Sequence, residues 1–114
     1  MAKYEKHLRG DFNELLSLLN TGIISGSVTA FIEGSSDYRL GDVRCAVRVY
    51  ERYSAIGGSR VSLNITLVGS GDDLFVSAIS SGGSQAMFFK INTLGEESFL
   101  QTATEIVERY GHSR

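Results

Sequence analysis

The chain has 114 residues, of which 42% are hydrophobic and 21% charged, and its formal net charge is −2. This length predicts one domain over residues 1–114, large enough to fold without a metal or a disulfide, and the elements expected below make it an α+β domain. The nearly balanced charge argues against a strongly basic nucleic-acid-binding protein and against a disordered chain, and no apolar run is long enough for a transmembrane helix.

The first elements expected are a weak strand and a helix. Residues 2–8 could form a strand, although charged residues interrupt their alternation. A helix is expected after Asp11, a good N-cap with Glu14 three residues later, and Gly22 is expected to end it in a left-handed conformation. The apolar residues that recur at helical spacing in this segment are Phe12, Leu15, Leu16 and Leu19.

Alternation with a period of two then predicts strands separated by glycine-rich turns. With residues 2–8 left open, these strands give a sheet of about five strands, or six at most. Consecutive strands joined by short turns predict a single antiparallel sheet. The expected strands cover residues 28–33, 43–50, 61–67, 74–78 and 86–91, and the expected turns cover 34–37, 55–59 and 69–72.

A second helix is expected after Thr93 or Gly95 and should end near Gly111. Its apolar face has helical spacing and consists of Phe99, Ala103, Ile106, Val107 and Tyr110. Two amphipathic helices and a one-sided sheet predict a two-layer sandwich, with the N-terminal and C-terminal helices packed on one face. This element order resembles the helix-over-sheet arrangements of the TATA-binding-protein-like and START/Bet v1 helix-grip groups.

The clearest strand, residues 43–50, has two distinct faces. We expect its valines and the single cysteine, Cys45, to point into the core, which would make the thiol buried and inert. The alternate residues should then form a row on the opposite, exposed face. This row consists of Arg44, Arg48, Tyr50 and Arg52.

Three interpretations of this row remain open. The first interpretation, which we favour, is a solvated face without a binding function, whose arginines pair with Glu33 and other carboxylates on neighbouring strands. The second is a protein interface, where arginine and tyrosine are common. The third is a site for an anion or RNA, which the overall acidity disfavours.

A second candidate interface is apolar. Large apolar residues also fall on the nominally exposed side of several strands, and such patches mark association when they adjoin. We favour this interpretation over scattered exposure. The residues are Phe31, Phe75, Ile79 and Phe88.

Catalytic and metal chemistry find little support in the sequence. The only histidines are His7 and His112, and neither has a second ligand at metal-binding spacing. We therefore expect no enzyme, no metal and no cofactor. The N-terminal residues lack the apolar run of a secretory signal, so a cytoplasmic location is expected.

Together, these patterns favour a non-catalytic binding or assembly module that self-associates through its sheet as a homo-oligomer, without nucleic-acid or membrane partners. The alternative is a small carrier of an apolar or anionic ligand held between helices and sheet.

Overall fold

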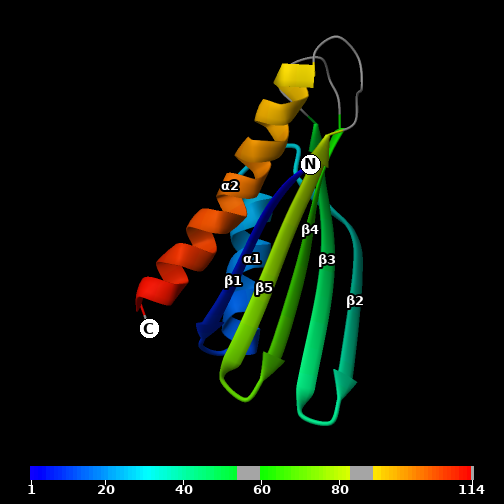
Figure 1. Cartoon of the computed structure of the whole chain (residues 1–114). Coiled ribbons are helices and arrows are strands. Elements are labelled where there is room, and N and C mark those ends of the chain that lie inside the picture. The colour runs from blue at the N-terminus through cyan, green and yellow to red at the C-terminus, as the bar shows by residue number, and fades with distance from the viewer. Residues whose placement is uncertain (54–59, 83–88, 114) are drawn as a thin grey trace.

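A computed structural model describes residues 1–53, 60–82 and 89–113, with the side chains of the last helix described from residue 97 to residue 112. It has one five-stranded antiparallel sheet in the order β1-β5-β4-β3-β2 and two helices (Figure 1). The elements are β1 (Ala2–Arg9), α1 (Phe12–Ser25), β2 (Phe31–Leu40), β3 (Val43–Tyr53), β4 (Arg60–Ser70), β5 (Asp73–Gly82) and α2 (Phe89–Ser113).

The expected α+β fold with one antiparallel sheet of about five strands is confirmed. Residues 2–8 do form a strand, since β1 pairs with β5 along its whole length. The prediction of a strand at 86–91 is wrong for residues 89–91, which belong to α2. Residues 86–88 lie outside the described residues. Gly95 therefore lies inside α2 and does not precede it.

Helix α1 begins as expected and ends later than expected. The Asp11 carboxylate accepts a hydrogen bond from the Glu14 backbone N–H at 2.8 Å, which satisfies one free donor of the first turn. The helix continues through Gly22 to Ser25 and is capped by Gly26. A Cβ atom at position 22 would lie 2.5 Å from Cδ1 of Ile106, so this glycine serves the close approach of α1 and α2 rather than a helix end.

The turn expected at residues 34–37 is wrong, because those residues lie in the middle of β2. The chain turns instead at Gly41 and Asp42, and a register shift between Ile32 and Gly34 accommodates Glu33 as a bulge. Gly41 has a φ of +62°, and Gly71 in the β4–β5 turn has a φ of +60°. Both hairpins therefore use the same two-residue Gly-Asp turn, with the glycine in the conformation that it adopts without strain.

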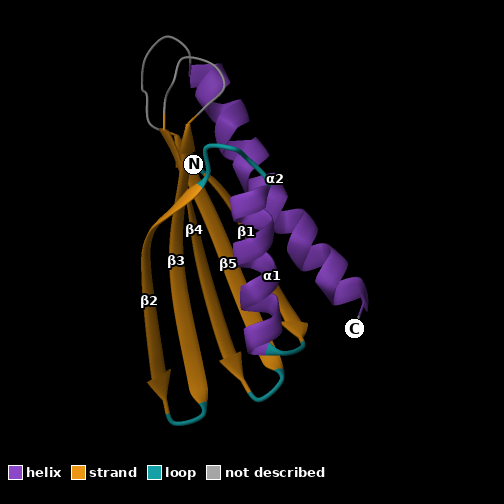
Figure 2. Cartoon of the chain, turned by 180° about the vertical axis from the view of Figure 1, so that it is seen from behind, coloured by secondary structure: helices purple, strands orange, loops and turns teal. Residues whose placement is uncertain are grey.

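Both helices lie on the same side of the sheet (Figure 2). We call the face of the sheet that contacts them the inner face and the opposite one the outer face. Helix α1 packs over β4, and α2 packs over β5, β1 and β4. The buried side chains form one cluster: Phe12, Leu15, Leu19 and Ile23 of α1; Ala46, Tyr50, Val61, Leu63, Ile65, Leu67, Leu74, Val76 and Ala78 of the sheet; and Phe99, Ala103, Val107 and Tyr110 of α2.

The faces of β3 are the reverse of those expected. Ala46 pairs with Leu67 and Tyr50 pairs with Leu63, and all four are buried against the helices. The arginine row shares this inner face, while the residues between its members, Cys45 among them, lie on the outer face. The prediction that the cysteine points into the core is therefore wrong.

Candidate functional site

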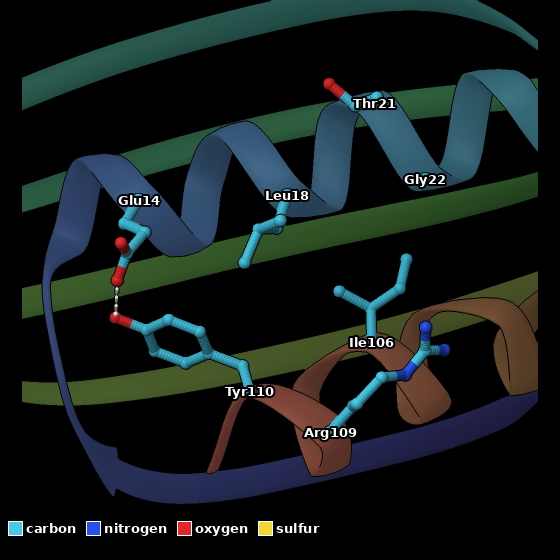
Figure 3. A pocket seen from close by; sticks show the side chains of 7 residues that line it. All are labelled: Glu14, Leu18, Thr21, Gly22, Ile106, Arg109 and Tyr110. Atoms are coloured by element: carbon cyan, nitrogen blue, oxygen red, sulfur yellow. Dashed lines mark hydrogen bonds between the residues drawn. The ribbon is translucent and has the colours of Figure 1, made fainter. Parts of the chain in front are cut away.

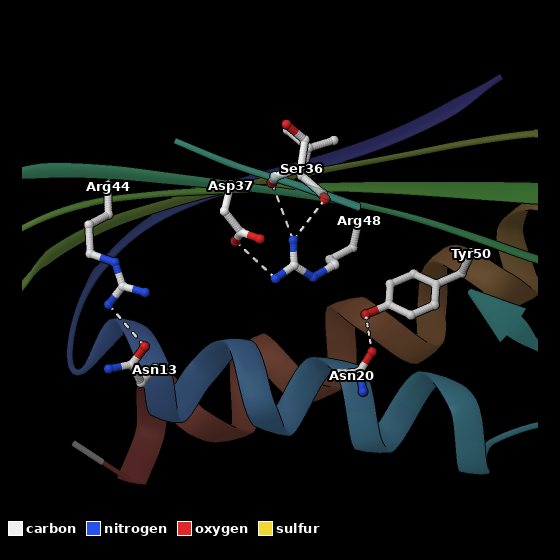
Figure 4. A network of polar contacts seen from close by, with 8 residues as sticks. Asn13, Asn20, Ser36, Asp37, Arg44, Arg48 and Tyr50 are labelled. Atoms are coloured by element: carbon white, nitrogen blue, oxygen red, sulfur yellow. Dashed lines mark hydrogen bonds and ion pairs between the residues drawn. The ribbon is translucent and has the colours of Figure 1, made fainter. Parts of the chain in front are cut away.

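The arginine row lies along the margin of the helical layer, where β3 passes beside α1 (Figure 4). The Arg44 guanidinium carbon lies 4.1 Å from the ring centroid of Phe12, and this guanidinium donates a hydrogen bond of 2.9 Å to Asn13 Oδ1. Gly69, directly opposite Arg44 on β4, leaves space for the Phe12 ring, since a Cβ there would lie 2.7 Å from Phe12 Cδ2.

Arg48 binds the neighbouring strand rather than a helix. Its guanidinium donates to the carbonyl oxygens of Ser36 and Val47 at 3.3 and 3.0 Å and forms an ion pair with Asp37 at 3.0 Å. Only 15% of its side chain is exposed. The guanidinium is thus held by three acceptors on β2 and β3, which ties the edge strand to the sheet.

The other end of the row contacts both helices. The buried Tyr50 hydroxyl donates a hydrogen bond of 2.8 Å to Asn20 Oδ1 of α1. Burial raises the pKa of Tyr50 to about 12, against a smaller opposing effect of the Arg48 charge. The Arg52 guanidinium carbon lies 4.5 Å from the ring centroid of Phe99 in α2, and this guanidinium donates to Ser98 Oγ at 3.1 Å. Burial also lowers the pKa of Arg52.

These contacts give the row a structural role. The long arginine side chains cover the margin of the core with their aliphatic parts and place their charges over aromatic rings or acceptors. Carboxylate pairing is seen for one of them, Arg48 with Asp37 on β2. A role in binding an anion or another protein stays a prediction for the row as a whole.

The outer face carries a continuous row of mostly apolar side chains that crosses every strand. The register places Cys45 between Tyr38 and Val68, and Phe75 between Val68 and His7. The rings of His7 and Phe75 meet edge to face, with centroids 5.7 Å apart. On the same face, Leu40, Val43 and Val47 flank this row, and the polar Thr66 and Ser77 lie beside Val68 and Phe75. Val49 and Ile79 lie farther along β3 and β5.

The residues predicted as an apolar interface are only partly brought together. Phe75 and Ile79 share the outer face of β5. Phe31 is also on the outer face, but it lies on the far edge strand, where it pairs with Glu51 and contacts the Arg60 guanidinium at 5.7 Å. Phe88 lies outside the described residues. The valines of β3 supply apolar side chains on the outer face between the β2 edge and β5. The sequence pattern had assigned these valines to the core.

Charged side chains occupy the end of the outer face near Phe31. Arg60 forms ion pairs with Glu51 and, at 3.8 Å, with Glu33. Ser62 Oγ donates a hydrogen bond of 3.2 Å to the same Glu51 carboxylate. The outer face is therefore polar at this end of β3 and β4, about six residues along the strands from the apolar row.

A groove of about 530 Å³ separates α1 from α2 (Figure 3). Leu18, Gly22 and Ile106 form the non-polar part of its lining, and the Tyr110 hydroxyl donates a hydrogen bond of 2.8 Å to Glu14 Oε1. Sequence reasoning missed this groove because it arises from the packing of α1 beside α2, which no local pattern in the sequence indicates. The lining residues are Glu14, Leu18, Thr21, Gly22, Ile106, Arg109 and Tyr110.

Within the part of the chain that the structure describes, no group of three or more histidine, cysteine, aspartate or glutamate side chains could hold a metal ion. Over the same residues, no helix is both long enough and apolar enough to cross a membrane.

Comparison of the sequence with models of known protein families assigns the chain to one family. A model of the family of unknown function DUF6054 matches residues 1–111. The chain belongs to the DUF6054 family. No curated protein matches the DUF6054 chain significantly. No solved structure does so either. The geometry of its surfaces is therefore the basis for any functional proposal about this DUF6054 domain.

Proposed function

We propose that the protein is a non-catalytic assembly domain that self-associates through the outer face of its sheet. The observation that carries this proposal is the apolar row running through Tyr38, Cys45, Val68 and Phe75, on the face opposite to both helices. A cytoplasmic location, expected from the sequence, is part of the same proposal.

The composition of the two faces supports association. An antiparallel sheet with one solvated face usually alternates apolar residues toward the core with polar residues toward water. Here β3 departs from this pattern by presenting valine and cysteine on the outer face, where Val43 is 38% exposed, whereas β4 follows it with Ser62, Asn64 and Thr66. Removing such side chains from water is favourable in proportion to the apolar area covered, and two sheets can pack face to face at about 10 Å.

A second copy of the chain is the occupant that we favour. Each copy carries the same outer face, so a two-fold axis would place one apolar row against another. Charged side chains lie at the margins, with Lys3 and Glu5 on β1 and Glu51 and Arg60 beside β2. This arrangement of an apolar centre and a polar rim is typical of protein interfaces.

A carrier function is the second candidate, and the groove between the helices favours it. Leu63, Ile65 and Phe99 are at most 1% exposed and fill the layer between helices and sheet at these positions. A ligand would therefore bind between α1 and α2, where Leu18 is 45% exposed and Ile106 forms the opposite wall. Leu18, Gly22 and Ile106 would contact an apolar part of such a ligand, and Glu14, Thr21, Arg109 and Tyr110 would surround it with polar groups.

Replacing Val47 with lysine tests the assembly proposal. Val47 lies near the centre of the outer face, between Ser36 and Thr66 in the register, so a lysine there would place a charge inside the contact. We expect sedimentation equilibrium to show a lower average mass for Val47→Lys than for the wild type at the same concentration.

The matched control is Ser17→Lys, which adds the same charge at an exposed position of α1. This variant should associate like the wild type. A wild type that stays monomeric at millimolar concentration would overturn the assembly proposal, and so would equal masses for Val47→Lys and the wild type.

A further inference from the structure

The two edges of the sheet differ in protection. The β1 edge contains Lys3 and Lys6, and α2 contacts it through Glu108, which forms an ion pair with Lys6 at 3.0 Å and accepts a hydrogen bond from Tyr4. The β2 edge has a bulge at Glu33 but no lysine or proline, and its residues 35–40, beyond the bulge, are exposed. Edge strands without such protection present free backbone groups to another strand.

One residue of this edge lacks an expected partner. Arg39 lies on the inner face directly opposite Arg44, and like charges in such a pair destabilise a sheet. Arg44 donates to Asn13, whereas the residues that the structure describes give Arg39 no ion pair or hydrogen bond. A carboxylate supplied from beyond the edge would relieve this repulsion.

The sequence around Tyr38 can supply that carboxylate from a second copy. Asp37 and Arg39 flank Tyr38 and share the inner face, because their register partners are Ala46 and Arg44. If two β2 strands pair antiparallel about a two-fold axis at Tyr38, Asp37 of each copy lies opposite Arg39 of the other. An axis at Asp37 would oppose two carboxylates, and one at Arg39 would oppose two guanidiniums, so the charges select Tyr38.

We propose that β2 pairs with β2 of a second copy about a two-fold axis at Tyr38, which joins two five-stranded sheets into one continuous sheet. The Tyr38 side chains, each 65% exposed, then lie side by side on the outer face. This edge contact goes beyond the outer-face association and is independent of it, since it uses backbone groups and inner-face charges.

Charge reversal in the Val47→Lys background tests the edge contact without a contribution from the outer face. Arg39→Asp would place two carboxylates opposite each other, and we expect the dissociation constant of the dimer to rise at least about tenfold. The double variant Asp37→Asn with Arg39→Asp removes the repulsion between the two carboxylates, keeps an acceptor for the Arg48 guanidinium and should restore part of the association. Lys3→Asp makes the same reversal on the β1 edge and should leave the dimer unchanged.

Sedimentation equilibrium, with thermal melts to verify folding, separates the outcomes. A Val47→Lys variant that is monomeric at every concentration overturns the edge contact and leaves the outer-face proposal standing. Failure of the double variant to associate, or unchanged association of Arg39→Asp, also overturns the edge contact. If Val47→Lys associates as strongly as the wild type, and adding Arg39→Asp abolishes that association, the edge contact is supported. The same result overturns the proposal of association through the outer face.

Discussion

Replacing Phe99 with alanine is expected to lower the free energy of unfolding by about 3–5 kcal/mol. Phe99 is 1% exposed and belongs to the single core cluster between α2 and the sheet. Its removal would leave a cavity there and would also remove the ring over which the Arg52 guanidinium lies. Urea unfolding followed by circular dichroism measures the change.

The contact between Arg52 and Phe99 can be isolated by a double-mutant cycle. Because the guanidinium lies over the ring, the effects of Arg52→Ala and Phe99→Ala should fall short of additivity by about 0.5–2 kcal/mol. Leu100→Ala, at a partly buried neighbouring position, serves as the control and should be additive with Arg52→Ala. Strict additivity of the first pair would contradict the contact between the Arg52 guanidinium and the Phe99 ring.

The stability of the protein is expected to fall steeply between pH 10 and pH 12. Tyr50 has a pKa raised by burial to about 12, whereas in the unfolded chain it titrates near 10. Above pH 10 the unfolded state therefore loses a proton that the folded state keeps, and unfolding becomes more favourable as pH rises. One pKa unit corresponds to about 1.4 kcal/mol, so the contribution of Tyr50 to this loss should approach about 2–3 kcal/mol by pH 12. Tyr4, whose pKa is also raised by burial and by Glu108, acts in the same direction.

Tyr50→Phe is the control for this pH dependence. It removes the ionisable hydroxyl and its hydrogen bond to Asn20, so the variant should be less stable at pH 8. Its stability should then change less than that of the wild type between pH 9 and pH 11.5. Equal slopes in guanidinium unfolding across this range would show that Tyr50 is not the group responsible.

The strands of the core were predictable from the sequence because their two faces differ strongly. On β4, Val61, Leu63, Ile65 and Leu67 alternate with polar residues, and all four are buried. On β3 the same rule gave the wrong face. Its two rows are valines with a cysteine and arginines with a tyrosine, and hydropathy alone selects the valines.

The outcome on β3 depends on tertiary structure. At the margin of the helical layer, an arginine can cover a ring with its aliphatic part while its charge reaches an acceptor, as Arg44 does with Phe12 and Asn13. Nothing local in the sequence shows which strand will lie at that margin. The valines are left on the outer face, which is the feature that our functional proposal uses.

The turn between β2 and β3 was predictable and was missed. Gly41-Asp42 repeats the Gly71-Asp72 dipeptide that was correctly placed in a turn, and both glycines have positive φ. The serines at 35 and 36, beside Gly34, suggested a turn there instead, because glycine and serine are common in loops. In the structure these residues form an edge strand with a bulge, where weak strand propensity is tolerated.

The most direct test of outer-face association is the alkylation rate of Cys45. This is the only cysteine in the chain, and it lies half-buried in the apolar row that we propose to be covered. The rate of reaction with iodoacetamide should fall as protein concentration rises through the range in which the average mass increases. A rate that stays constant while the protein assembles would contradict association through this face.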